Sequence, residues 1–97
     1  MKQQTKTKQK AYYHVMYGAK DLKFRYPGES CKNLTLTEAK TVMNDRVKRA
    51  VKNYRLMGAT VVNLYKTASR VKFRTTYGNG DTNVVTYMIK KTINPVK

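Results

Sequence analysis

The chain has 97 residues and carries 21 Lys and Arg against 5 Asp and Glu, which gives a formal net charge of +16. This length is typical of one domain, and the single Cys and single His exclude a disulfide framework and a structural zinc site. Repulsion among so many like charges destabilises a small compact protein, so the composition favours an anionic partner that would neutralise them.

The first ten residues, MKQQTKTKQK, contain no apolar residue after Met1. This composition predicts a disordered basic arm rather than a signal peptide. No later apolar run approaches the roughly 18 residues that a membrane span needs. With a single thiol in addition, we expect a cytoplasmic protein without a membrane span. Arms of this kind either follow phosphates in nucleic-acid complexes or only raise solubility.

Two strands are expected after the arm, at residues 11–17 and 22–26. The first segment, AYYHVMY, is rich in aromatic and β-branched residues. In the second, LKFRY, apolar and basic residues alternate, which predicts one apolar and one basic face. The residues 18–21 between them are typical of a turn, so the two segments predict a β-hairpin.

The only substantial helix is expected between Thr35 and Gly58. Apolar residues recur there at steps of three and four, the spacing of one helical face. Thr35 and Glu38 form a T-x-x-E capping box, and Gly58 stands where a left-handed residue commonly ends a helix. The apolar face should cover a sheet, while the opposite face is mostly basic.

Three further strands are expected at residues 59–66, 70–77 and 82–91. The middle segment, RVKFRTTY, shows the clearest alternation in the chain. The sequence GNGD at 78–81 favours a chain reversal, because Gly and Asn tolerate positive φ angles. Residues 94–97 are expected to form a short tail.

We therefore predict an α+β fold with one domain over residues 11–93 and the element order ββαβββ. One helix would pack on one face of an antiparallel sheet and leave the other face open. Residues 1–10 and 94–97 would lie outside this domain.

The open face of the predicted sheet is the main candidate site. If the apolar residues of the second and fourth strands face the helix, alternation turns five cations to the opposite side. Like charges on neighbouring strands repel each other, whereas a bound polyanion would reward this pattern through phosphate contacts and counterion release. The alternative is a generic basic surface that blocks edge pairing. The five cations are Lys23, Arg25, Arg70, Lys72 and Arg74.

Other cations could extend this surface. The basic helix face could lie along a phosphate backbone or enter a major groove, and the arm lysines could add contacts. Because the helix and the open face would lie on opposite sides of the domain, we prefer the sheet. The additional candidates are Lys48, Arg49, Lys52 and Arg55 of the helix and Lys6, Lys8 and Lys10 of the arm.

Exposed tyrosines on a basic sheet would add stacking on unpaired bases. Tyrosine is, however, also a normal strand and core residue, and this is the favoured explanation. The candidates are Tyr12, Tyr65, Tyr77 and Tyr87.

No catalytic motif emerges from the sequence. One His and one Cys, His14 and Cys31, do not specify a nucleophile and its base. The carboxylates are scattered, and the GNGD segment joins two strands instead of opening a helix as a phosphate loop does. The apolar stripe of the helix lacks the Trp or Phe anchors of membrane-surface helices. We therefore expect no enzyme activity, no metal and no cofactor.

The favoured interpretation is a small non-enzymatic protein that binds nucleic acid, DNA or RNA, by gripping the phosphate backbone. The alternative is a small effector, of the kind that viruses encode, that binds and modulates an acidic host protein. Exposed edge strands also leave a homodimer open as a third arrangement.

Overall fold

The computed structural model describes residues 11–19 and 22–97, so the predicted arm and residues 20 and 21 lie outside the described part. Its elements are β1 (Tyr12–Ala19), β2 (Leu22–Arg25), the short 3-10 helix η1 (Glu29–Cys31), α1 (Leu36–Leu56), β3 (Thr60–Lys66), β4 (Arg70–Thr76) and β5 (Thr82–Thr92). The predicted α+β class and the order ββαβββ are confirmed.

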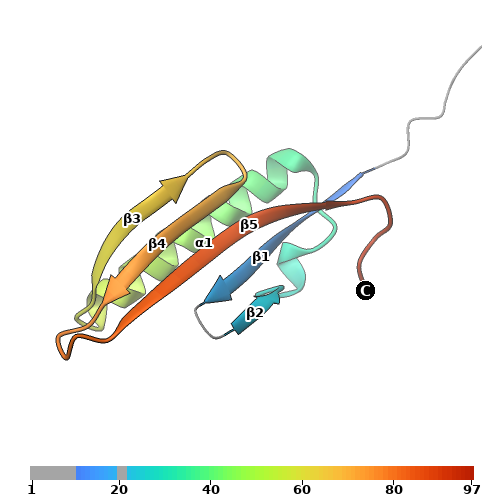
Figure 1. Cartoon of the computed structure of the whole chain (residues 1–97). Helices are drawn as coiled ribbons and strands as arrows, with labels where there is room; N and C mark the ends of the chain where they lie inside the picture. Colours follow the sequence, from blue (N-terminus) through green and yellow to red (C-terminus); the bar gives the residue numbers. More distant parts are fainter. Residues whose placement is uncertain (1–10, 20–21) are drawn as a thin grey trace, which may run out of the picture.

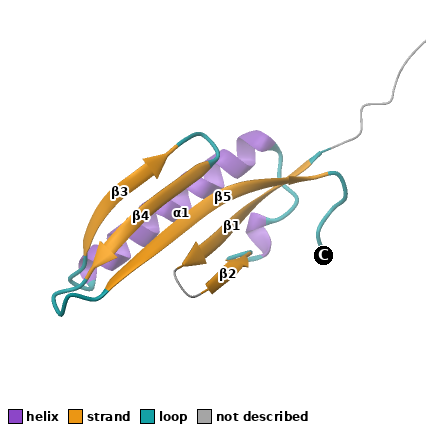
Figure 2. Cartoon of the chain, viewed as in Figure 1, coloured by secondary structure: helices purple, strands orange, loops and turns teal. Residues whose placement is uncertain are grey.

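The five strands form one antiparallel sheet in the order β2-β1-β5-β4-β3. β5 is the central strand and pairs with β1 on one side and β4 on the other. α1 packs against one face, so the molecule has one layer of sheet and one layer of helix (Figure 1, Figure 2). Within residues 11–19 and 22–97, no helix covers the other face of the sheet, as predicted.

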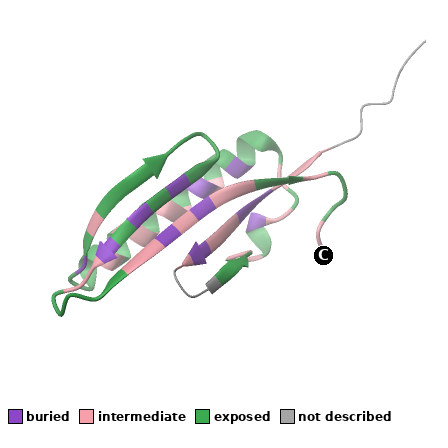
Figure 3. Ribbon diagram, in the orientation of Figure 1, coloured by how far each residue is buried: buried purple, intermediate pink, exposed green. Residues whose placement is uncertain are grey.

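The core lies between α1 and the sheet. Along β4, Val71, Phe73 and Thr75 are buried while the residues between them are exposed (Figure 3). The ring centroid of Phe73 lies 6.1 Å from that of Tyr54 on α1 and 6.5 Å from that of Tyr87 on β5. Burial raises the pKa of both tyrosines to about 12. Both hydroxyls therefore stay protonated at neutral pH.

The ends of α1 follow from the local sequence. The main-chain N–H of Thr35 donates to Glu38 Oε1 at 2.9 Å, and the N–H of Glu38 donates to Thr35 Oγ1 at 3.1 Å. This reciprocal pair is the predicted capping box, and its hydrogen bonds lower the pKa of Glu38. Gly58 follows the helix with a φ of 86°, a left-handed conformation that glycine adopts without strain.

The first hairpin differs from the prediction. The sequence predicts Gly18 and Ala19 in a turn, whereas both continue β1 and pair with Thr86 and Val85 of β5. The long central strand offers them partners that local sequence does not reveal. Gly18 also permits a close approach, because a Cβ atom at this position would lie 3.0 Å from the ring of Phe24.

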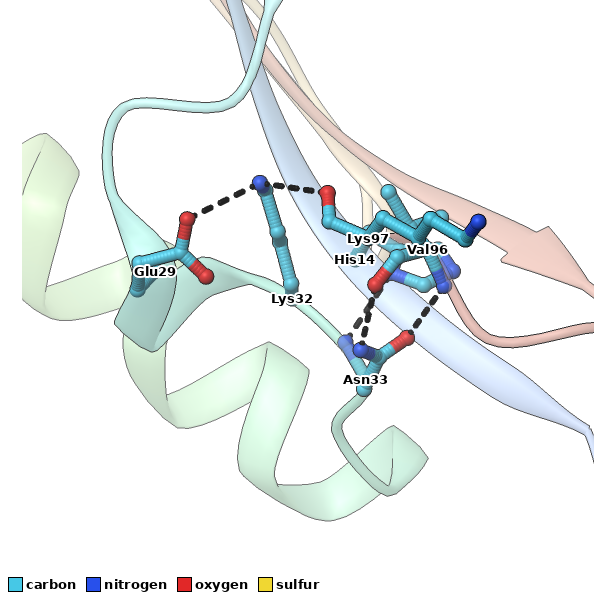
Figure 4. Close-up of polar contacts among 6 residues, drawn as sticks. All are labelled: His14, Glu29, Lys32, Asn33, Val96 and Lys97. Atoms are coloured by element: carbon cyan, nitrogen blue, oxygen red, sulfur yellow. Dashed lines mark hydrogen bonds and ion pairs between the residues drawn. The ribbon is translucent and has the colours of Figure 1, made fainter.

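Val96 and Lys97, at the end of the segment expected as a tail, contact the loop that precedes α1 (Figure 4). The Asn33 side chain donates to the Val96 carbonyl and accepts from the Val96 N–H, both at 2.8 Å. Lys32 Nζ donates to the main-chain oxygen of Lys97 at 2.9 Å. We call this set of contacts the C-terminal clasp.

His14 lies beside the C-terminal clasp and is fully buried. The main-chain N–H of Asn33 donates to His14 Nδ1 at 3.0 Å, so this nitrogen carries no proton. His14 Nε2 carries the proton of the neutral ring and donates to Thr92 Oγ1 at 2.7 Å. A second proton on Nδ1 would oppose the Asn33 donor, and burial lowers the pKa of His14.

Replacing Thr35 by Ala should lower the free energy of unfolding by about 1 kcal/mol, because an N–H in the first turn of α1 loses its acceptor. Urea denaturation followed by circular dichroism would measure the loss. Thr37→Ala is the matched control, since Thr37 is exposed and takes no part in the capping box. An equal loss in both variants would contradict the role of the cap.

Stability should fall as the pH drops below 6.5, the ordinary pKa of histidine. The folded pKa of His14 is lower than this value, so between the two the unfolded chain binds the extra proton and is favoured. The stabilisation is thus complete above 6.5 and is lost as the pH falls through the folded pKa. Urea unfolding between about pH 7.5 and about pH 5 would measure it.

The control for this pH dependence is His14→Gln. His14 is the only histidine in the chain, so the variant should have a flatter stability profile across this interval, whatever its absolute stability. A flat profile in the unmodified protein, or an unchanged slope in the variant, would show that another group is responsible.

Candidate functional site

Three cations of β4 form a row on the face of the sheet that α1 leaves uncovered. Arg70, Lys72 and Arg74 alternate with the buried residues of β4, and all three are exposed. Alternate residues of a strand lie about 6.8 Å apart on one face. The three side chains therefore present positive groups in line, and we call them the β4 row.

Strand β3 places two exposed apolar side chains next to the β4 row. Val62 pairs with Arg74, and Tyr65 pairs with Lys72, so each shares the face of its partner. In a regular strand Leu64, not Tyr65, would share the face of Val62, but the register shifts between the two pairs. Tyr65 is 49% exposed and is a predicted stacking residue that does lie beside the cations.

The prediction that β2 adds its cations to this face is wrong for Arg25. Arg25 pairs with Tyr17, and Tyr17 pairs with Tyr87, which is buried under α1. Phe24, predicted to face the helix, instead lies against Gly18 on the uncovered face and is 45% exposed. A register shift in the β1–β2 pairing causes the reversal, because one extra residue inverts the alternation.

The cations of β2 are also far from the β4 row. In the strand order β2-β1-β5-β4-β3, two strands separate Lys23 and Arg25 from β4. Tyr87, another predicted stacking residue, is 8% exposed and belongs to the core. The structure thus brings together three of the five cations predicted for the open face, and the arm lysines at 6, 8 and 10 lie outside the described residues.

A second basic surface lies on the other side of the sheet, in a groove between α1 and β3. The groove has a volume of about 980 Å³. It exists because a single helix leaves the edge strand β3 largely exposed (Figure 3). The cations that line it are Lys40, Lys48, Lys52 and Arg55 of α1 and Lys66 of β3.

Arg49, the fourth helix cation predicted for binding, lies outside the groove. Its Nε is 3.1 Å from Asp45 Oδ2 in an ion pair one helical turn away. It lines a smaller depression on the other flank of α1. Of the four helix cations predicted from the sequence, Lys48, Lys52 and Arg55 line the groove and Arg49 does not.

Sequence reasoning missed the groove and its two further cations, Lys40 and Lys66. A signal was present, because Lys40, Lys48 and Lys52 recur at multiples of four and so share one flank of a helix. The spacing of these lysines does not predict where α1 lies over the sheet. That position depends on how the core side chains pack, and it decides which strand borders the basic flank.

The described carboxylates are all engaged away from these two surfaces. Glu29 and Asp45 each form an ion pair with a basic residue three or four positions away. Glu38 closes the helix cap, and Asp81 accepts a hydrogen bond inside the β4–β5 turn. Among residues 11–19 and 22–97, no cation of the β4 row or the groove forms an ion pair. Both surfaces therefore carry uncompensated positive charge.

The described part of the chain contains no group of three or more His, Cys, Asp or Glu side chains able to hold a metal ion. Both ring nitrogens of His14 bind other residues, and Cys31 is buried. In the same residues, no helix has the length and apolar character needed to cross a bilayer.

Comparison of the chain with protein-family models, with curated proteins and with solved structures returns no significant match.

Proposed function

We propose that this protein binds nucleic acid through phosphate contacts at the β4 row. The observation that supports the proposal is the imbalance of charge on the molecule. The described acidic side chains are used in local caps, turns and ion pairs, and none of them is paired with a cation of the β4 row. A nucleic-acid backbone supplies regularly spaced negative charge, and its binding releases condensed counterions.

The residue types of the β4 row suit this role. Arg70 and Arg74 carry guanidinium groups, which bind phosphate oxygens through two parallel N–H···O bonds. Lys72 between them supplies a compact point charge. Tyr65 and Val62 on β3 add an apolar border along the same face, where a sugar or the face of an unpaired base could pack.

An acidic protein surface is the competing partner, because it would be attracted by the same charge. A pull-down with the tagged chain, with and without nuclease treatment, separates the two. Recovery of nucleic acid that nuclease abolishes supports the proposal. Recovery of one acidic protein that persists after nuclease treatment contradicts it, and would favour the effector interpretation.

The double variant Lys72→Gln/Arg74→Gln should bind labelled oligonucleotides about tenfold more weakly or worse. Removing two phosphate contacts should also make the slope of log K against log salt for duplex DNA less negative by about 1.8. Fluorescence anisotropy at several salt concentrations would measure both quantities.

The matched control is Lys23→Gln/Arg25→Gln, which removes the same two residue types at the opposite edge of the sheet. This variant should lose much less affinity, because it changes net charge without touching the β4 row. If both variants lose affinity equally, binding depends only on total charge and the β4 row is not the site.

A further inference from the structure

The phosphate contacts proposed for the β4 row make no use of the groove between α1 and β3. It runs beside the edge strand β3, on the face opposite to the β4 row. Its helix flank extends from Lys40 to Arg55, a distance of about 22 Å along the helix axis at 1.5 Å per residue. The groove is therefore long enough to follow several units of a polymer.

The floor of the groove is apolar. Val71 on β4 is 3% exposed, and Val47, Val51 and Val61 are partly buried against the core. A polyanion that only touches the protein through phosphates gains nothing from such a floor. A ligand that also carries flat apolar faces, as nucleobases do, would bury them there.

Two side-chain amides, Asn44 on α1 and Asn63 on β3, line the same groove. Both residues are exposed, and neither side chain is held by a hydrogen bond to the described part of the chain. An amide offers both donors and an acceptor, so it can pair with the edges of bases. Apolar floor, amides and cationic rim together match the three parts of a nucleotide.

A double helix does not present these three parts to a recess. Its bases are paired and stacked, so the grooves expose only their edges and their flat faces are covered. A helix that reads duplex DNA must itself project into the major groove, whereas the cations of α1 border a hollow beside a strand. Unpaired nucleotides, by contrast, can turn their bases inward and leave their phosphates at the rim.

We infer that the groove between α1 and β3 binds a single-stranded segment of nucleic acid, with phosphates at Lys48, Lys52, Arg55 and Lys66 and bases over the valine floor. This inference rests on the proposed function and adds to it a preference for unpaired strands. The β4 row contributes to binding of any nucleic acid, while the groove contributes only when a strand is free of its complement.

The test compares Lys48→Gln/Lys52→Gln with Lys90→Gln/Lys91→Gln. Both variants lose two exposed lysines, but the second pair lies on β5 and neither lines the groove nor belongs to the β4 row. The probes are a labelled single-stranded DNA of about 16 nucleotides and the duplex made from it. Circular dichroism melting curves establish that all variants are folded.

The groove variant should bind the single strand about tenfold more weakly than the control variant does. Its salt slope for the single strand should be less negative by about 1.4, the value for two lost phosphate contacts. Its affinity for the duplex should be no lower than that of the control.

Equal affinities of the two variants for the single strand would overturn the inference, as would an equal loss for both probes. Binding of the duplex alone by the unmodified protein would overturn it too, while leaving the proposed function intact. If the unmodified protein binds neither probe at low salt, the proposed function itself fails and the inference falls with it.

Discussion

The pairing of the central strand β5 with both of its neighbours is the constraint on which this structure depends. Tyr87 of β5 lies opposite Val71 on β4 and opposite Tyr17 on β1, so these three residues face α1 together. A slip of one residue in either pairing would turn every side chain of that strand to the other face. For β4 the slip would bury Arg70, Lys72 and Arg74, and unpaired buried charge is prohibitively costly. The same alternation thus specifies the core and, on the opposite face, the β4 row.

Where the local pattern was strong, the sequence was enough to predict the structure. The capping box at Thr35 and Glu38, the left-handed Gly58 and the alternation along β4 depend on neighbouring residues only, and all three are found. The failures occur where pairing partners decide. β1 extends through Gly18 because β5 is long enough to pair with it, and β2 turns Arg25 away from the open face because its register shifts.

The candidate site divides in the same way. The three cations of the β4 row were predictable because a single strand carries them with an unambiguous period. The groove was not, because its cations come from α1 and β3, and their meeting depends on where the helix settles across the sheet. The local use of the described carboxylates was only partly visible: a capping box shows in the sequence, but the Glu29–Lys32 and Asp45–Arg49 ion pairs require coordinates. Because Glu29 and Asp45 pair with neighbouring cations, they do not neutralise the charge of the β4 row or of the groove.

The register shift in β3 has a consequence for how copies of this protein behave beside one another. β3 is an edge strand whose outer hydrogen-bonding groups face no other strand of the sheet, and regular edges of this kind invite other chains to add on, up to fibril formation. The irregularity between Asn63 and Tyr65 interrupts the even ladder that an incoming strand would need, and Lys66 adds charge at the end of the strand. The register shift in β3 therefore has two effects: it turns Tyr65 toward the face of the β4 row, and it helps to prevent edge-to-edge pairing between copies of the protein.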